Sequence, residues 1–258
     1  MVPRRRAQPD SIAWSHMLSR LPVALCIMAK LPNAGACKTR LVPALSYEQA
    51  AELSRAFVRD TVENVLAVAQ QTNAVGWVAY TPDAGAAELR KAFGGDIATL
   101  AQRGTAFGER LLNAIVDLLA AGHRAVCVID SDSPTLPPAT LRRAVEACDG
   151  SDRVVIGPAT DGGYYLLGLA RAQSELFEGI SWSTALVAAQ TVARARDIGL
   201  PIMFLREWYD VDDASDLETL SNELSSKQPK GGYFAPYTRA AMARLGTAPA
   251  VESFAALQ

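Results

Sequence analysis

The sequence predicts a three-layer α/β/α fold with a mostly parallel sheet. Short apolar runs bounded by turn residues are typical of buried strands. They fall at residues 23–29, 75–80, 97–101, 125–129, 153–157 and 201–205. Helical periodicity fills most of the gaps between these runs. Because strands that alternate with helices usually pair in parallel, we expect helices on both faces of one sheet.

The clearest helix follows the first predicted strand, at about residues 47–70. Ser46 and Gln49 have the spacing of a capping box, and apolar residues then recur on one side of the helix. Pro137 and Pro138 mark the start of a later helix, and Asp213 is a good N-cap for the last one. The further helices are expected near residues 84–93, 106–121, 137–149, 184–198 and 213–224.

The length of 258 residues and the apolar half of the composition predict one domain, at residues 21–224. Residues 1–20 contain three arginines but no hydrophobic core, which predicts a flexible arm rather than a signal peptide. Residues 225–258 read as a polar linker and tail. Their amphipathic stretch, Tyr237 to Leu245, either stays loose or packs on the domain or on a second copy of the chain in a homodimer.

Composition argues against several classes of function. A net charge of −2 provides no global basic field for nucleic acid or a membrane surface, and no run of about 18 apolar residues predicts a membrane span. Four cysteines without CxxC spacing indicate free thiols and a cytoplasmic location. Two histidines leave little material for a zinc site or a His-based triad.

An acidic motif, Asp130-Ser131-Asp132, directly follows the apolar run at 125–129. In α/β sheets, ligand-binding and catalytic residues usually lie at the carboxyl ends of the strands. Carboxylates two residues apart on extended backbone point the same way, so both can face one Mg²⁺ or Mn²⁺ that also binds diphosphate oxygens. The alternative is an Asp/Ser/Pro turn that leads into the next helix.

A basic loop follows the first predicted strand, from Lys30 to Arg40. Gly35 permits close backbone approach, and Lys38 and Arg40 have the charge to neutralise a diphosphate. The loop is not a Walker A motif, because Pro32 and Cys37 stand where glycines are required. A solvated basic loop is the alternative.

Paired glycines and an aspartate, Asp161-Gly162-Gly163, follow the run at 153–157. They predict a loop that presses backbone against a ligand while Asp161 reaches it. Asp-Gly is also a strong signal for a tight hairpin turn.

Three further segments carry candidate residues. Asp210 and Asp212 precede a predicted helix, where they either complete the coordination of a cation or simply add charge to a helix-entry loop. Glu109 and Arg110 contact a base or sugar in one interpretation and pair with neighbours in the other. Trp182 either stacks on an acceptor or anchors its loop to the core.

Taken together, these motifs resemble the small bacterial GT-A-type glycosyltransferase-like family called selenodomain-associated transferase 1, over roughly residues 22–222. The motifs are Lys30-Leu31-Pro32, Gly35, Lys38-Thr39-Arg40-Leu41, Gly108-Glu109-Arg110, Ser131-Asp132-Ser133-Pro134, Asp161-Gly162-Gly163-Tyr164-Tyr165 and Asp210-Val211-Asp212. The resemblance implies a nucleotide-diphospho-sugar transferase (GT-A) fold, related to the molybdopterin and phospholactate nucleotidyltransferases, with a divalent cation at the Asp132 loop. The family usually has Gly where Asp130 stands, so this chain carries a full DxD.

The function expected from these residues is metal-dependent transfer of a sugar from a nucleotide diphosphate sugar to a small acceptor. The metal ligands are expected to be Asp132, Asp130 and Asp212, with Mg²⁺ or Mn²⁺ as the cofactor. The catalytic candidates are Asp161, Lys38 and Arg40. The nucleotide-binding candidates are Ala29, Lys30, Gly35, Lys38, Arg40, Gly108, Glu109, Arg110, Asp130, Ser131, Gly162 and Gly163. A nucleotidyltransferase that releases pyrophosphate, or a nucleotide-binding protein without turnover, are the alternatives.

Overall fold

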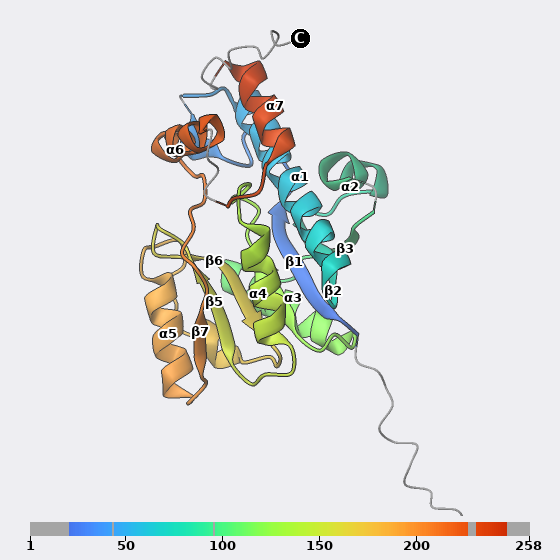
Figure 1. The fold of residues 1–258 in the computed structure, drawn as a ribbon, viewed down its shortest axis with the longest axis vertical. Helices are drawn as coiled ribbons and strands as arrows, with labels where there is room; N and C mark the ends of the chain where they lie inside the picture. Colours follow the sequence, from blue (N-terminus) through green and yellow to red (C-terminus); the bar gives the residue numbers. More distant parts are fainter. Residues whose placement is uncertain (1–20, 43, 95, 227–230, 247–258) are drawn as a thin grey trace, which may run out of the picture.

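A computed structural model of the chain describes residues 21–42, 44–94, 96–226 and 231–246. The expected arm at 1–20 and the end of the expected tail, 247–258, lie outside the described residues. Within them, seven strands form one sheet in the order β3-β2-β1-β4-β6-β5-β7 (Figure 1). The strands are β1 (Val23–Lys30), β2 (Ala74–Thr81), β3 (Ala98–Ala101), β4 (Val126–Ile129), β5 (Val154–Pro158), β6 (Tyr164–Leu169) and β7 (Ile202–Phe204).

The predicted α/β fold with a mostly parallel sheet is confirmed, and the exception is β6. This strand runs antiparallel to both β4 and β5. The sequence pattern did not predict it, because the run Tyr164–Leu169 follows β5 so closely that no helix separates them. The Asp161-Gly162-Gly163 segment is therefore the turn of a β5–β6 hairpin, as its alternative interpretation held.

Among the described residues, six helices form where periodicity predicted them, and the amphipathic stretch that was left open forms a seventh, α7. They are α1 (Tyr47–Gln71), α2 (Ala86–Phe93), α3 (Phe107–Ala120), α4 (Pro138–Cys148), α5 (Val187–Asp197), α6 (Ala214–Ser225) and α7 (Pro236–Leu245). Ser46 and Gln49 form the predicted capping box of α1, and the Asp213 side chain caps α6. Two short 3₁₀ turns, Thr39–Leu41 and Ser174–Phe177, complete the elements.

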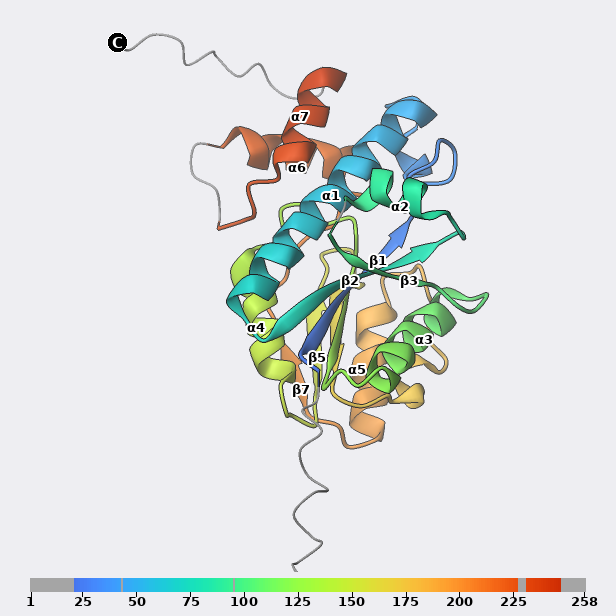
Figure 2. The same ribbon diagram turned by 90° about the vertical axis from the view of Figure 1, so that its right-hand side faces the viewer.

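Helices α1 and α4 cover one face of the sheet, and α3 and α5 cover the other (Figure 2). The alternation of side chains along β1 explains this division. Leu25 and Ile27 pack in the core under α1 and α4, whereas Ala24 and Cys26 pack in the core under α3. Every side chain of β1 before Lys30 is buried, as expected for a central parallel strand.

A third core joins α1 to α6 and α7, beyond the carboxyl end of β1 (Figure 1). Phe57 of α1, Leu220 of α6 and Met242 of α7 are fully buried in it. The carboxylate of Asp60 in α1 accepts the backbone N–H groups of Tyr237 and Thr238 at the start of α7, at 3.1 and 2.6 Å. The amphipathic stretch thus packs on its own domain within the described residues.

The parallel register places the carboxyl ends of β1, β2, β3 and β4 at one edge of the sheet. Lys30 at the end of β1 is in register with Thr81 at the end of β2, and Ile27 of β1 is in register with Ile129 at the end of β4. The loops that follow these strands therefore meet at this edge. No helix in the described part of the chain is long and apolar enough to cross a membrane.

Candidate functional site

Two adjoining cavities lie at the carboxyl edge of the sheet. The first has a volume of about 310 Å³ and is lined by α1 and by the loops that follow β1, β3 and β4. The second has about 230 Å³ and is lined by the β4 loop, the β5–β6 hairpin and the segment around Trp182. Met28, Phe107 and Asp212 line both cavities, so the two lie side by side.

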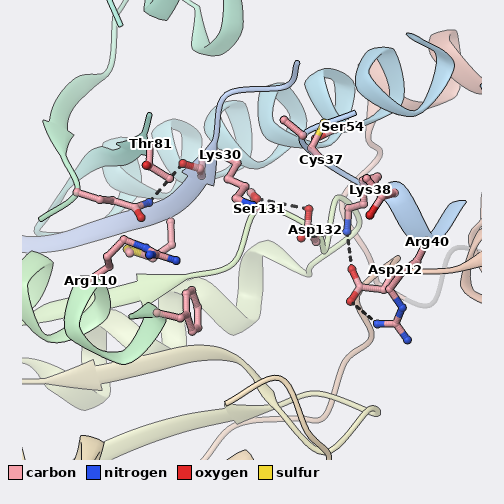
Figure 3. A pocket seen from close by; sticks show the side chains of 16 residues that line it. Lys30, Cys37, Lys38, Arg40, Ser54, Thr81, Arg110, Ser131, Asp132 and Asp212 are labelled. Atoms are coloured by element: carbon pink, nitrogen blue, oxygen red, sulfur yellow. Dashed lines mark hydrogen bonds and ion pairs between the residues drawn. The ribbon is translucent and has the colours of Figure 1, made fainter. Parts of the chain in front are cut away.

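A lysine with a buried side chain lines one end of the first cavity. The Nζ atom of Lys38 lies 3.0 Å from Oδ2 of Asp132 and 2.7 Å from Oδ1 of Asp212 (Figure 3). Arg40 approaches the other oxygen of Asp212 at 3.4 Å. The Lys38 side chain is only 5% exposed. Its backbone has φ 48° and ψ 36°, a left-handed conformation that a β-carbon disfavours and that functional loops often hold.

Charge balance explains why the lysine is stable there. Burial by itself lowers the pKa of Lys38, but the neighbouring carboxylates of Asp132 and Asp212 outweigh it, so the net pKa lies above the ordinary value. Lys38 is therefore a permanent cation. Lys30 and Arg110 also line this cavity, and Arg110 lies at the end opposite the Lys38 cluster (Figure 3). Four cations thus surround a space that suits a polyphosphate.

The two carboxylates of the DxD face different cavities. Asp132 lines the first cavity beside Lys38, whereas Asp130 lines the second. The expectation that both face one cation assumed extended backbone, but β4 ends at Ile129 and the chain bends at residues 131 and 132. Asp132 and Asp212 converge instead, because the backbone N–H of Val211 donates to the carbonyl of Asp132 at 3.0 Å.

Carboxylates dominate the second cavity. Asp130, Asp161, Asp210 and Asp212 all line it. Burial raises the pKa of Asp130 well above its ordinary value, and the charges of Asp132 and Asp210 raise it further. Burial, with the charges of Asp161 and Asp212, raises the pKa of Asp210 to about 7.

Aromatic side chains line the second cavity together with the carboxylates. Trp182 meets Phe107 edge to face with ring centroids 5.4 Å apart, and it stacks on Phe177 at 6.4 Å. A β-carbon at Gly108 would come within 2.5 Å of Nε1 of Trp182, so this glycine lets the indole pack directly on α3. Trp182 therefore anchors its loop by packing on Phe107, Phe177 and Gly108, and it also lines the second cavity.

Most of the predicted site residues come together at these cavities. Those that line the first are Ala29, Lys30, Lys38, Arg40, Arg110, Ser131, Asp132 and Asp212. Those that line the second are Asp130, Asp161, Gly163 and, again, Asp212.

Four predicted nucleotide-binding residues line neither cavity. Gly35 is exposed with φ +76°, and Gly108 packs under Trp182. Gly162 has φ +89° and lies where a β-carbon would meet the backbone of Ala185 at 2.3 Å, so it serves the hairpin turn. Glu109 accepts the N–H groups of residues 105 and 106 and thereby caps α3. The geometry gives these four residues structural roles.

Several cavity residues escaped the sequence analysis. Ser54 comes from the middle of α1, Thr81 from the end of β2, and Gln102 directly follows β3. Gln102 donates to the carbonyls of Ala29 and Ala79 at 3.3 and 2.8 Å, which ties the ends of three strands together. Their position in the sequence could have identified Thr81 and Gln102. Polar residues at the carboxyl ends of parallel strands are candidate site residues once the fold is recognised.

Asp132 and Asp212 are the carboxylates of the first cavity that could hold a divalent cation. Within the described residues, no three His, Cys, Asp or Glu side chains are grouped to hold a metal. Mg²⁺, however, commonly takes only one or two carboxylates and completes its shell with water and substrate phosphates. Asp132 and Asp212 fit that pattern, because their oxygens already converge on one positive charge.

Comparisons with known proteins agree with this fold. Residues 61–184 match a family model described as an uncharacterized protein conserved in bacteria (DUF2064). The chain is similar to a provisionally named nucleotide-diphospho-sugar transferase from Desulfovibrio desulfuricans G20, with 28% identity and a TM-score of 0.73 over 86% of this chain and 95% of that one.

A second solved structure, a nucleotidyl transferase from Methanothermobacter, matches with 18% identity and a TM-score of 0.51 over 77% of this chain and 95% of that one. That likeness shows the fold alone. No curated protein matches the sequence. The expected nucleotide-diphospho-sugar transferase fold is confirmed, and the chain is similar to transferases.

Proposed function

We propose that this protein transfers a glycosyl group from a nucleotide diphosphate sugar to a small acceptor, as a relative of the selenodomain-associated transferases. The observation that carries the proposal is the pair of adjoining cavities, one with four cations and one with carboxylates and aromatic rings. In this assignment the first cavity binds the donor and the second binds the acceptor. The similarity to the Desulfovibrio protein supports the same class of donor.

The donor's diphosphate is bound by Lys38 and Arg40, which are joined through Asp212. Asp132 and Asp212 are the residues that would hold Mg²⁺ or Mn²⁺, which would supply positive charge next to the diphosphate. A permanently charged lysine, fixed by burial, is preorganised to stabilise the charge that develops as the nucleoside diphosphate leaves.

The transfer step needs a nucleophile and a proton acceptor. A hydroxyl of the acceptor attacks the anomeric carbon, the bond from that carbon to the diphosphate oxygen breaks, and its electron pair leaves with the nucleoside diphosphate. Asp161 takes the hydroxyl proton in our proposal, because it is exposed on the hairpin at the rim of the second cavity.

Nucleotidyl transfer is the second candidate, and one observation favours it. Lys30, Lys38, Arg40 and Arg110 line the first cavity, so a triphosphate would also meet basic side chains there. In that reaction a phosphorylated acceptor attacks the α-phosphorus and pyrophosphate leaves.

The products separate the two reactions. The purified protein with Mn²⁺ is incubated with nucleotide diphosphate sugars and a panel of hydroxyl acceptors, and separately with nucleoside triphosphates and phosphorylated acids. Glycosyl transfer releases a nucleoside diphosphate in the first set, and nucleotidyl transfer releases pyrophosphate in the second. Pyrophosphate release without any nucleoside diphosphate would overturn the glycosyltransferase proposal. The Asp132→Asn variant is the control for release that does not depend on this site.

A further inference from the structure

The second cavity has a one-sided charge. Asp130, Asp161, Asp210 and Asp212 line it, and no lysine, arginine or histidine does so among the residues that the structure describes. The first cavity differs, because Lys38 is paired there with both of its aspartates. Asp161, which is exposed at the rim of the second cavity, forms no ion pair with a basic side chain among the described residues.

One carboxylate oxygen in this cavity is also left without a donor. Oδ2 of Asp130 accepts the hydroxyl of Ser133 at 2.8 Å. Its other oxygen, Oδ1, is buried and has no hydrogen-bond partner within the described part of the chain. A buried acceptor without a partner is unfavourable, so a hydrogen-bond donor that reaches this oxygen is favoured over one that does not.

Aromatic rings supply the rest of the cavity surface. Trp182 and Phe107 form the edge-to-face pair described above, and Tyr164 lines the same space. Aromatic faces together with carboxylates are the combination that recognises organic cations, through cation–π attraction and charge-assisted hydrogen bonds. A hydrated metal ion gains nothing from the rings.

We infer that the second cavity selects an acceptor that carries an organic cation, such as a primary amine, next to an apolar or aromatic group, and that it rejects anionic acceptors. This inference rests on the proposed function, since it takes the first cavity as the donor site. It also argues against the phosphorylated acceptor that nucleotidyl transfer requires, because like charges in a shared cavity disfavour binding.

Three probes with the same phenyl ring test the charge preference. They are 2-phenylethylamine, 2-phenylethanol and 3-phenylpropionate, titrated into the full chain and followed by ligand-observed NMR at neutral pH with EDTA. We expect the amine to bind about tenfold more tightly than the carboxylate, with the alcohol between them. Added salt should weaken the amine most, because screening acts on the charge.

Variants assign the preference to this cavity. Asp161→Asn keeps the acceptor oxygen that receives the Gly163 N–H and removes only the charge, so amine binding should weaken about fivefold. Asp161→Lys should reverse the order of amine and carboxylate. Phe107→Ala, at a ring that is 44% exposed and so tolerant of truncation, should weaken all three probes. Asp152→Asn, the same charge change at an exposed residue outside both cavities, should leave every affinity unchanged.

Three results would overturn the inference: no amine binding at about 10 mM, a carboxylate that binds as tightly as the amine, or an unchanged order in Asp161→Lys. None of these results bears on nucleotide binding at the donor site, which is tested separately by titrations with UDP and Mn²⁺. Failure of the amine with intact UDP binding therefore removes this inference alone. Amine binding without any nucleotide binding removes the proposed function instead.

Discussion

The ammonium of Lys38 lies 2.7 Å from the carboxylate of Asp212, although 174 residues separate them in the chain. This contact joins the loop after β1 to the segment before α6. The backbone bond from Val211 to Asp132 holds the same segment against the DxD loop. The donor cavity is thus assembled only when three distant segments meet, and it depends on Lys38 for its charge balance.

Removing the Lys38 charge should weaken phosphate binding selectively. In Lys38→Met, we expect the affinity for UDP to fall at least about tenfold while that for uridine stays the same, because only the diphosphate needs the buried cation. Isothermal titration calorimetry with both ligands measures this. Lys91→Met, at an exposed lysine of α2, is the matched control. Equal losses for UDP and uridine would show that the loop serves folding instead.

Metal dependence should disappear with Asp132. In the wild-type chain, Mn²⁺ should raise the affinity for UDP at least about tenfold, because it links two carboxylates to the diphosphate. Asp132→Asn should abolish this gain, and Asp152→Asn should retain it. Titrations of UDP with Mn²⁺ or with EDTA give the comparison. A full Mn²⁺ gain in Asp132→Asn would place the metal elsewhere or remove it from the function.

The contact between Gly108 and Trp182 should tolerate no side chain. Gly108→Ala puts a methyl group 2.5 Å from the indole nitrogen, so the ring must shift, at a cost of about 1–3 kcal/mol in the free energy of unfolding. Chemical denaturation and tryptophan fluorescence report the two effects. Gly85→Ala, where a β-carbon meets nothing within 4 Å, should cost less than about 1 kcal/mol. Wild-type stability and fluorescence in Gly108→Ala would contradict the packing.

The docking of α7 on α1 should depend on pH through Asp60. Burial raises the pKa of Asp60 to about 6, although its bonds to Thr238 and Tyr237 oppose this. An unfolded aspartate titrates near 4, so between these values the folded chain binds more protons. The contribution of Asp60 to stability is therefore complete below pH 4 and is lost as the pH rises through 6.

The contribution of Asp60 to the free energy of unfolding is about 2–3 kcal/mol, because its pKa differs by about two units between the folded and unfolded chain. Asp60→Asn should lack this component, so the difference in unfolding free energy between wild type and variant should change between pH 4 and pH 6 and level off above pH 7. Urea unfolding across this range isolates the effect from other carboxylates. A constant difference would mean that Asp60 titrates normally.

The sequence pattern predicted the order of most buried strands and amphipathic helices. Strand β1 is apolar at nearly every position because both its faces are covered, and Ser46, Pro138 and Asp213 mark helix starts through local backbone chemistry. These signals depend only on residues that are close in the sequence, so they predict strands and helix starts without knowledge of the tertiary structure. The antiparallel strand β6 was missed because it follows β5 after a tight turn, whereas the pattern led us to expect a helix between successive strands.

The sequence by itself determined which loops carry charge: the basic loop at Lys38, the DxD, and the acidic segment at Asp212. Only the tertiary structure decided how they combine. It pairs Asp132 with Asp212 around one lysine and turns Asp130 toward a second cavity. The physical reason is that side-chain direction beyond a strand depends on where the backbone bends and which distant segment packs against it. Neither is set by the spacing of residues along the chain.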